Sequence, residues 1–252
     1  MKKFNKFLAV LLPVITIICI LILWSIGADA VDSKYILPSV MDTVEAMFVL
    51  FKTSKFYVAF SLTLLRSLIA FIVSFFIASI FAYFANKSKK IESVVLTVVS
   101  ILRALPTIAI VLLLVLWTDE QVAPIIVTML VVLPTAYTNI KNAFDSVDKT
   151  TTEAGKVDGA SSKQILFKIQ LPQITPALLS SIGSGISLNF KLMVAAEVLS
   201  ATIKSLGNLL NNAKNSIDGI ASMLAMVLIT IIFGILIEFL FNKIASKLGD
   251  WK

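Results

Sequence analysis

Residues 150–178 read TTTEAGKVDGASSKQILFKIQLPQITPAL, and this polar stretch between long apolar segments decides how the whole chain is interpreted. Thr150 followed by Glu153 at the third position predicts a capping box, in which both side chains bond the first backbone amides of a helix. Gly159 then interrupts the helical pattern, because glycine favours turns. The first half of the stretch therefore predicts one short helix that ends at a glycine turn.

The second half of the stretch predicts another helix. Ser161 with Gln164 forms a second capping-box pattern, and the following apolar residues recur on one helix face: Ile165, Leu166 and Ile169. Pro172 is expected to end this helix, because proline disfavours helical geometry in the residue before it. Together the halves predict a helix–turn–helix hairpin over 150–172 at the membrane surface. An ordinary interfacial linker with good caps is the simpler alternative.

Apolar segments lie on both sides of the hairpin. The chain of 252 residues is 58% hydrophobic and 15% charged, which is too little polar surface for a soluble domain. Segments of about 18 or more apolar residues can cross a bilayer as helices, and they occupy 7–26, 58–84, 93–117, 122–140, 174–199 and 220–242. The sequence therefore predicts one all-α domain over 1–252, with about six transmembrane helices in a lipid bilayer.

The first apolar segment also resembles a secretory signal, because MKKFNK precedes it and Ala28-Asp29-Ala30 follows it. Its apolar run of about 20 residues is longer than the roughly 7–15 residues of a signal core. We therefore expect a retained helix, and cleavage would leave the remaining topology unchanged.

Lysines are distributed unevenly between the two sides of the membrane. With the N-terminus in the cytoplasm, the inner segments hold fourteen: Lys2, Lys3, Lys6, Lys87, Lys89, Lys90, Lys141, Lys149, Lys156, Lys163, Lys168, Lys243, Lys247 and Lys252. The outer segments hold five: Lys34, Lys52, Lys55, Lys204 and Lys214. The positive-inside rule therefore predicts both termini in the cytoplasm. It also accounts for the net charge of +7 without a nucleic-acid partner.

The residue types that most catalytic sites need are missing. The chain has no histidine and one cysteine, Cys19, which excludes disulfide frameworks, His/Cys metal sites and histidine-based triads. The motif G-x-x-x-x-G-K-[ST] is not in the sequence, so a P-loop that binds nucleotide phosphates is not expected. We expect no enzyme activity, no cofactor and no metal in this chain.

The hairpin resembles the EAA loop of the permease subunits of binding-protein-dependent ABC importers. That pattern is Glu-Ala-Ala, three residues, Gly, nine residues, Ile, one residue and Leu-Pro, and this chain matches it at Glu153, Ala154, Gly159, Ile169, Leu171 and Pro172. Gly155 replaces the second alanine, which should soften the first helix. The resemblance implies a coupling helix that docks in a groove of a cytoplasmic ATPase. Gly159 would make the turn and Glu153 would help to fix the docking geometry, with Asp158 and Ala160 beside the turn.

The likeness extends beyond the loop. Four segments look like the nitrate/sulfonate/taurine branch of this family: ILPSV at 36–40, LLRSLIAF at 64–71, RALPTIAIVLLLVLW at 103–117 and AAEVLSATIKSLGNLL at 195–210. Two departures concern the solute. The third span ends in LWTDE, where that branch usually continues with Phe-Gly, and Lys191 stands where an apolar or aromatic residue is common.

The resemblance implies a type I ABC importer permease (MetI-like) fold in a bacterial plasma membrane, as a homodimer. It implies two kinds of partner, which are cytoplasmic ATPase subunits and an extracytoplasmic substrate-binding protein. The implied solute is small and anionic, like nitrate, a sulfonate or taurine. A pyrimidine precursor of thiamine is the alternative solute for the same machinery.

The fifth span holds the candidate pathway residues. A strip of small residues either lines a polar conduit or forms a helix–helix seam: Ser180, Ser181, Gly183, Ser184, Gly185 and Ser187. Including the polar and ionisable residues that follow, the pathway set is Ser184, Ser187, Asn189, Lys191 and Glu197. Lys191 could favour an anionic solute, reach the membrane interface or pair with Glu197. Arg66 and Arg103 are expected to be structural anchors.

Two other classes of protein remain open at this point. A self-sufficient secondary transporter often shows inverted repeats and buried carboxylate relays. The sequence shows no convincing internal repeat, and Glu197 and Glu238 lie near the ends of their spans. A membrane scaffold or polysaccharide-processing protein would leave the spacing of the hairpin unexplained. The sequence therefore favours the importer subunit.

Overall fold

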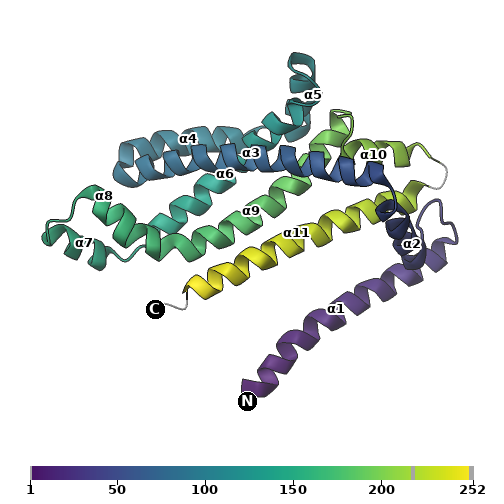
Figure 1. The fold of residues 1–252 in the computed structure, drawn as a ribbon, viewed down its shortest axis with the longest axis horizontal. Helices are drawn as coiled ribbons and strands as arrows, with labels where there is room; N and C mark the ends of the chain where they lie inside the picture. Colours follow the sequence, from purple (N-terminus) through teal and green to yellow (C-terminus); the bar gives the residue numbers. More distant parts are fainter. Residues whose placement is uncertain (1, 217–218, 250–252) are drawn as a thin grey trace. The chain divides into compact units, whose positions relative to one another are not determined.

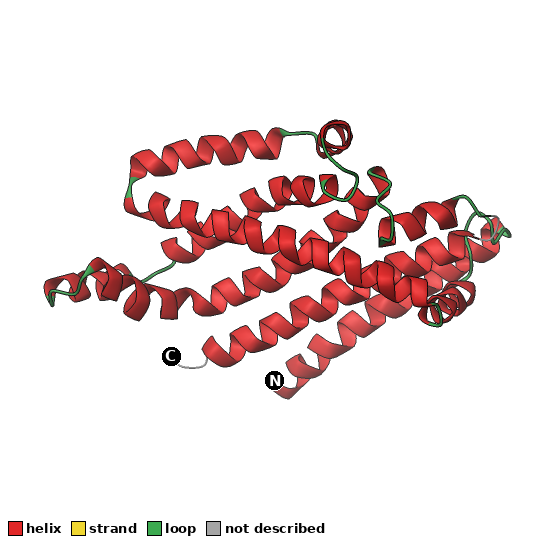
Figure 2. Ribbon diagram, turned by 45° about the horizontal axis from the view of Figure 1, so that its top comes forward, coloured by secondary structure: helices red, strands yellow, loops and turns green. Residues whose placement is uncertain are grey.

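The computed structural model describes residues 2–216 and 219–249, and every regular element in this part of the chain is a helix (Figure 2). In chain order the helices are α1 (Lys2–Val31), α2 (Val40–Phe51), α3 (Ser54–Lys87), α4 (Lys89–Ala104), α5 (Thr107–Trp117), α6 (Ala123–Asp145), α7 (Lys149–Val157), α8 (Ser162–Ile165), the π-helix η1 (Leu166–Gln170), α9 (Leu171–Leu199), α10 (Leu206–Lys214) and α11 (Gly219–Gly249). Lys252, which contributed to the predicted orientation, lies outside the described residues.

The chain divides into two compact units. Unit 1 comprises Met1–Tyr57 and Leu209–Ile229, and unit 2 comprises Val58–Asn208 and Thr230–Lys252. In unit 1, the indole nitrogen of Trp24 in α1 donates a hydrogen bond to the Pro38 carbonyl at 3.0 Å. Ser39 caps α2, because its hydroxyl accepts the Asp42 amide while the Asp42 carboxylate accepts the Ser39 amide. These local bonds define the connection between α1 and α2.

Long apolar helices agree in number with the predicted membrane spans. Within residues 2–216 and 219–249, five helical segments are long and apolar enough to cross a membrane, or six if the bent pair α4 and α5 counts as one span. The predicted ranges 7–26, 58–84, 174–199 and 220–242 lie inside α1, α3, α9 and α11, and 122–140 begins one residue before α6. The membrane boundaries along these helices stay predictions.

The predicted third span, 93–117, is not one continuous helix. It breaks between α4 and α5, which are bent by 88° (Figure 1). Leu105 and Pro106 at the break are extended, with ψ of 125° and 108°. Proline lacks an amide hydrogen and pushes the preceding residue out of helical geometry. Hydropathy registers the apolar run but not this break, which lies where Pro106 predicts a kink.

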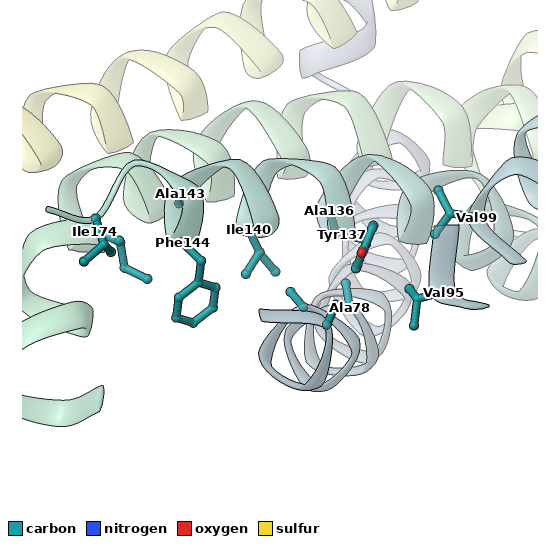
Figure 3. Close-up of a cluster of buried hydrophobic side chains, with 12 residues drawn as sticks. Ala78, Val95, Val99, Ala136, Tyr137, Ile140, Ala143, Phe144 and Ile174 are labelled. Atoms are coloured by element: carbon teal, nitrogen blue, oxygen red, sulfur yellow. The ribbon is translucent and has the colours of Figure 1, made fainter. Parts of the chain in front are cut away.

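The core of unit 2 lies where α3, α4, α6 and α9 meet (Figure 3). Its buried side chains combine alanines of α3 and α6 with larger residues: Ala78, Ala82, Ala85, Val95, Val99, Ala136, Tyr137, Ile140, Ala143, Phe144, Val147 and Ile174. Small residues beside large ones allow helices to pack closely, which is how membrane helices associate in the absence of a strong hydrophobic driving force. α6 and α9 pack extensively against each other, so the hairpin between them starts and ends on one packed scaffold.

The chain does not leave helical geometry at Pro172, contrary to the prediction. α8 continues through the π-helix η1 into α9, and Pro172 is the second residue of α9. A π turn shifts the hydrogen-bond register, so the proline ring avoids the carbonyl that it would strike in a regular α-helix. The second arm of the hairpin is therefore continuous with the predicted fifth span.

Candidate functional site

The first arm of the hairpin is α7, and its cap differs from the prediction. Asp148 is the capping residue: its Oδ1 accepts the Thr150 amide at 3.0 Å, and its carboxylate accepts the Thr151 hydroxyl at 2.6 Å. The predicted capping box of Thr150 and Glu153 is therefore wrong. The Asp148 carboxylate, two residues before Thr150, accepts the Thr150 amide that Glu153 was expected to bond. Hydrogen bonds from Thr151 and then Thr150 lower the pKa of Asp148 to about 2.

Gly159 makes the turn between the two arms, as predicted. Its φ of +77° lies in the left-handed region, which a side chain disfavours. Its amide donates to the Lys156 carbonyl at 3.1 Å, and the Ala160 amide donates to the Gly155 carbonyl at 2.9 Å. Asp158 is the last residue before the turn. These bonds close the carboxyl end of α7, so the turn depends on the glycine rather than on neighbouring side chains.

The second arm begins at the predicted capping box. The Ser161 amide donates to Gln164 Oε1 at 2.8 Å, and the Gln164 amide donates to Ser161 Oγ at 3.3 Å. The two arms also touch: a side-chain carbon on Gly155 would lie 2.6 Å from Ile169 Cδ1. The glycine that departs from the EAA pattern therefore makes room for Ile169, which matches the pattern. Leu171 follows at the start of α9.

The hairpin presents polar and apolar side chains to its surroundings. Glu153, Ala154 and Asp158 are exposed, and so are two large apolar residues, Val157 at 86% and Phe167 at 64% of their surface. Sequence reasoning did not select Val157 or Phe167. Val157 had a visible signal, because it is the large apolar residue of the mostly polar segment KTTTEAGKV, whereas Phe167 lies among other apolar residues and had none.

A pocket of about 440 Å³ lies between α7 and the ends of α4 and α6, and Glu153 and Lys156 line it from α7. On the opposite side, Lys141 Nζ lies 3.2 Å from Glu92 Oε1 and 2.5 Å from Asp145 Oδ1. The side chain of Lys141 is largely buried, so these ion pairs lie in a partly shielded environment. Charged side chains of α7 therefore face a fixed ionic cluster on α4 and α6.

The small residues of α9 form close helix contacts. A side-chain carbon on Gly183 would lie 2.5 Å from Phe241 Cβ, and one on Gly185 would lie 2.6 Å from Phe71 Cε2. Ser184 bonds a carbonyl one turn earlier in its own helix at 3.2 Å. In this part of the strip, the contacts are those of a helix–helix seam.

Ser187 and Lys191 lie one turn apart on α9 and share a neighbour in α11. A side-chain carbon on Gly234 would lie 2.7 Å from Ser187 Oγ and 3.0 Å from Lys191 Cε. Ser187 is buried, whereas Lys191 is exposed. Lys191 makes no ion pair within residues 2–216 and 219–249, and Glu197 is instead occupied by Arg66 at 3.0 Å. Of the three alternatives for Lys191, pairing with Glu197 is therefore wrong.

Asn189 and Glu197 are fully buried on α9. Asn189 Nδ2 donates to the Ser67 carbonyl of α3 at 2.6 Å. Arg66 pairs with Glu197, and Arg103 Nη2 donates to the Pro134 carbonyl of α6 at 3.3 Å. Both arginines thus make the interhelical bonds expected of structural anchors.

These features define a class: a multi-span helical membrane protein with an exposed, capped hairpin that continues into a core helix. The chain belongs to the family described as binding-protein-dependent transport system inner membrane component, which matches residues 74–250. It is therefore a permease subunit of an ABC importer and a multi-pass component of the plasma membrane.

Two curated relatives are similar to this chain. The methionine import system permease protein MetP of Bacillus subtilis (strain 168) is 30% identical over 173 residues, which cover 62% of this chain and 76% of that protein. The formylaminopyrimidine transport permease protein ThiX of Halalkalibacterium halodurans is 22% identical over 245 residues, or 95% of each chain. The second relative is consistent with the predicted branch. Their names refer to different solutes, so membership of the family does not define the solute.

Solved structures support the fold. A crystal structure of an amino acid ABC transporter with histidines has a TM-score of 0.65 to this chain at 16% identity, and the match covers 79% of this chain and 96% of that one. The predicted all-α type I importer permease fold is therefore confirmed.

Proposed function

We propose that this chain forms half of a homodimeric pathway for a small anionic solute, which an extracytoplasmic binding protein delivers. ATP hydrolysis takes place in separate cytoplasmic subunits, and both termini of this chain lie in the cytoplasm. The observation that carries the proposal is the hairpin over 150–172, which is exposed at its tip and continuous with the pathway helix α9.

The hairpin has the properties of a docking element. Val157 and Phe167 expose apolar surface, and this surface would be buried if the hairpin docked in a groove of a soluble partner. Glu153 and Asp158 add charged groups that select the orientation of the partner. We assign the contact with the ATPase to these four side chains, around the turn at Gly159.

The second arm transmits the movement of the ATPase. Because α8, η1 and α9 form one continuous helical segment, displacement of the hairpin moves Ser187 and Lys191 as parts of the same rod. The first arm acts on a different set of helices, since Glu153 and Lys156 face the Lys141 ionic cluster on α4 and α6. Closure of the ATPase would thus displace α9 through the second arm, and α4 and α6 through the first arm.

Lys191 supports an anionic solute. It is a cation on the predicted fifth span, exposed in one protomer and with no ion-pair partner among the described residues. A charge inside a membrane is costly unless it faces a cavity or a partner. A sulfonate or carboxylate passing the site would supply the missing counter-charge. A neutral pyrimidine would gain less from Lys191 and is the second candidate.

The coupling part of the proposal is tested by purifying the tagged chain in mild detergent and identifying the bound proteins by mass spectrometry. A P-loop ATPase should be recovered with the wild type and lost from a Gly159→Val, Glu153→Ala variant. Gly159→Asn is the matched control, because asparagine tolerates the left-handed conformation. A chain that purifies alone and moves solute down an ion gradient in liposomes would instead be a secondary transporter.

The solute part is tested with the reconstituted importer in proteoliposomes, using taurine and a neutral aminopyrimidine as probes. Lys191→Gln should reduce taurine transport about tenfold, since a charge-assisted hydrogen bond is worth roughly 1.5–3 kcal/mol. Lys191→Arg should retain most of it. Equal transport of both probes by wild type and Lys191→Gln would contradict a role for this cation.

A further inference from the structure

A buried polar network joins the end of α9 to three other segments of unit 2. Glu197 on α9 is fully buried, and its Oε1 lies 3.0 Å from Arg66 Nη1 on α3. Glu197 Oε2 accepts the Thr63 hydroxyl at 2.7 Å. We call this the Arg66–Glu197 network, and it comprises Thr63, Arg66, Gln121, Glu197, Leu206 and Gly207.

The network holds the first residues of α10 against α9. The Leu206 amide donates to Thr63 Oγ1 at 3.0 Å, and the Gly207 amide approaches Glu197 Oε2 at 3.4 Å. A side-chain carbon on Gly207 would lie 2.5 Å from the Glu197 backbone carbon. The turn between α9 and α10 is therefore pressed onto the helix that precedes it, and the Glu197 carboxylate bonds the α10 side of the turn through the Gly207 amide.

The same network reaches the connection between α5 and α6. The second terminal nitrogen of Arg66 donates to Gln121 Oε1. Beside it, the Thr202 hydroxyl donates to the Glu120 carbonyl at 2.7 Å. Two connections far apart in the sequence are thus tied to α3 at one end of unit 2. This is the extracytoplasmic end in the proposed orientation, and Glu197 lies six residues beyond Lys191 along α9.

The turn between α9 and α10 has a strained backbone, and the Arg66–Glu197 network leaves one buried donor unpaired among the described residues. Ala201 and Lys204 in the turn have φ of +54° and +50°, which disfavours residues with a side chain. Gln121 Nε2 is buried without a hydrogen-bond partner in the part of the chain that the structure describes. An unpaired buried donor and a strained turn both raise the free energy of the observed arrangement relative to one in which they are relieved.

We propose that the Arg66–Glu197 network is a latch that closes the outer end of the pathway and opens when the importer faces outward. Glu197 and Arg66 are positioning residues: they hold the two connections together and do not contact the solute. This inference rests on the proposed orientation of the chain. When Arg66 and Glu197 separate, water enters and hydrates the two charges in place of the ion pair. The latch therefore has a closed state without water and an open, hydrated state.

The experiment measures access of water to the turn. Ser200 lies in the turn and is buried, so Ser200→Cys in a Cys19→Ser background gives a reporter thiol. The chain in right-side-out vesicles is treated with a membrane-impermeant maleimide. Adding Glu197→Gln should raise the labelling rate about tenfold or more, because the charge-assisted hydrogen bonds of the carboxylate to Arg66 and Thr63 are weakened. Arg66→Lys should restore part of the protection that Arg66→Met removes.

Two controls separate a latch from general unfolding. Ser74→Cys reports on the buried middle of α3 and should stay unlabelled in every variant. Glu92→Gln neutralises a paired glutamate at the other end of unit 2 and should leave position 200 protected. If Glu197→Gln destabilises the fold, the milder Thr63→Val, which leaves the ion pair intact, should still produce a smaller rise at position 200 alone.

An unchanged labelling rate in Glu197→Gln and Thr63→Val, or equal acceleration at positions 200 and 74, would overturn the latch. Acceleration seen only with a permeant maleimide would support the latch and contradict the proposed orientation. The assay requires neither the ATPase nor a solute, so failure of the coupling proposal would not alter its outcome.

Discussion

The hairpin over 150–172 and the Arg66–Glu197 network are held together in opposite ways. Bonds in the hairpin join near neighbours, such as Asp148 with Thr150. The network joins Arg66 to Glu197, which are 131 positions apart in the sequence. Local bonds in an exposed segment survive when the segment moves as a body, whereas distant buried bonds break when helices separate. This difference fits the two proposed roles, in which the hairpin transmits movement and the network responds to it.

The largest effect is expected from removing the buried carboxylate. Glu197→Ala leaves Arg66 as an uncompensated, largely buried charge, which typically costs about 3–5 kcal/mol. The thermal unfolding temperature of the purified chain in detergent should fall accordingly. Glu92→Ala, whose carboxylate is more exposed, should cost clearly less. If both substitutions lower the unfolding temperature equally, the Arg66–Glu197 network does not stabilise the fold more than the Glu92–Lys141 ion pair does.

The close approach of α10 to α9 provides the next largest effect. Gly207→Ala places a methyl group 2.5 Å from backbone atoms of Glu197 and Val198, which cannot move aside as a side-chain tip does. The expected cost is about 1–3 kcal/mol, measured by thermal unfolding. Gly27→Ala is the control, because its methyl group would meet only Leu37 Cδ2 at 3.5 Å. If both substitutions are neutral, α10 is not pressed against α9.

A substitution in the hairpin turn should reduce solute transport more than it reduces the stability of the fold. Gly159→Val places a β-branched residue at φ +77°, and the left-handed conformation costs roughly 1–2 kcal/mol per residue. Membrane insertion should be retained, while solute transport coupled to ATP hydrolysis is lost. Gly159→Asn should keep transport. Undiminished transport by the valine variant would remove the hairpin from the coupling mechanism.

The smallest effect concerns the cap of α7. The pKa of Asp148 is lowered from 3.8 to about 2 in the folded chain, so its ionised form stabilises α7. This contribution is complete above pH 3.8 and is lost as the pH falls toward 2. Amide hydrogen exchange of α7 should therefore accelerate over that range relative to an Asp148→Asn variant, whose ratio to wild type cancels the intrinsic pH dependence. The network amides, which do not depend on Asp148, should show no such change.

Much of the fold could be predicted from the sequence, because long apolar runs and short-range caps are local properties. The hydrophobic segments predicted the helices, and Ser161 with Gln164 predicted the start of α8. Predictions failed where two local signals competed. Asp148 replaced Thr150 as the cap, and a π turn carried the helix through Pro172. The predicted range of the third span failed as one helix, but its break lies at Pro106, where proline predicts a kink because its backbone constraint outweighs the apolar run.

The sequence by itself determined the class of this protein, the hairpin with its turn at Gly159, and the helices that carry them. Those features depend on hydrophobic periodicity, hydropathy and interactions between residues a few positions apart, and all three can be read from the amino-acid sequence. Only the tertiary structure decided that Glu197 pairs with Arg66 rather than with Lys191, since both cations are chemically suitable partners. Packing places Arg66 of α3 beside Glu197 and leaves Lys191 exposed. The choice of a partner for a buried charge is a property of the assembled helices.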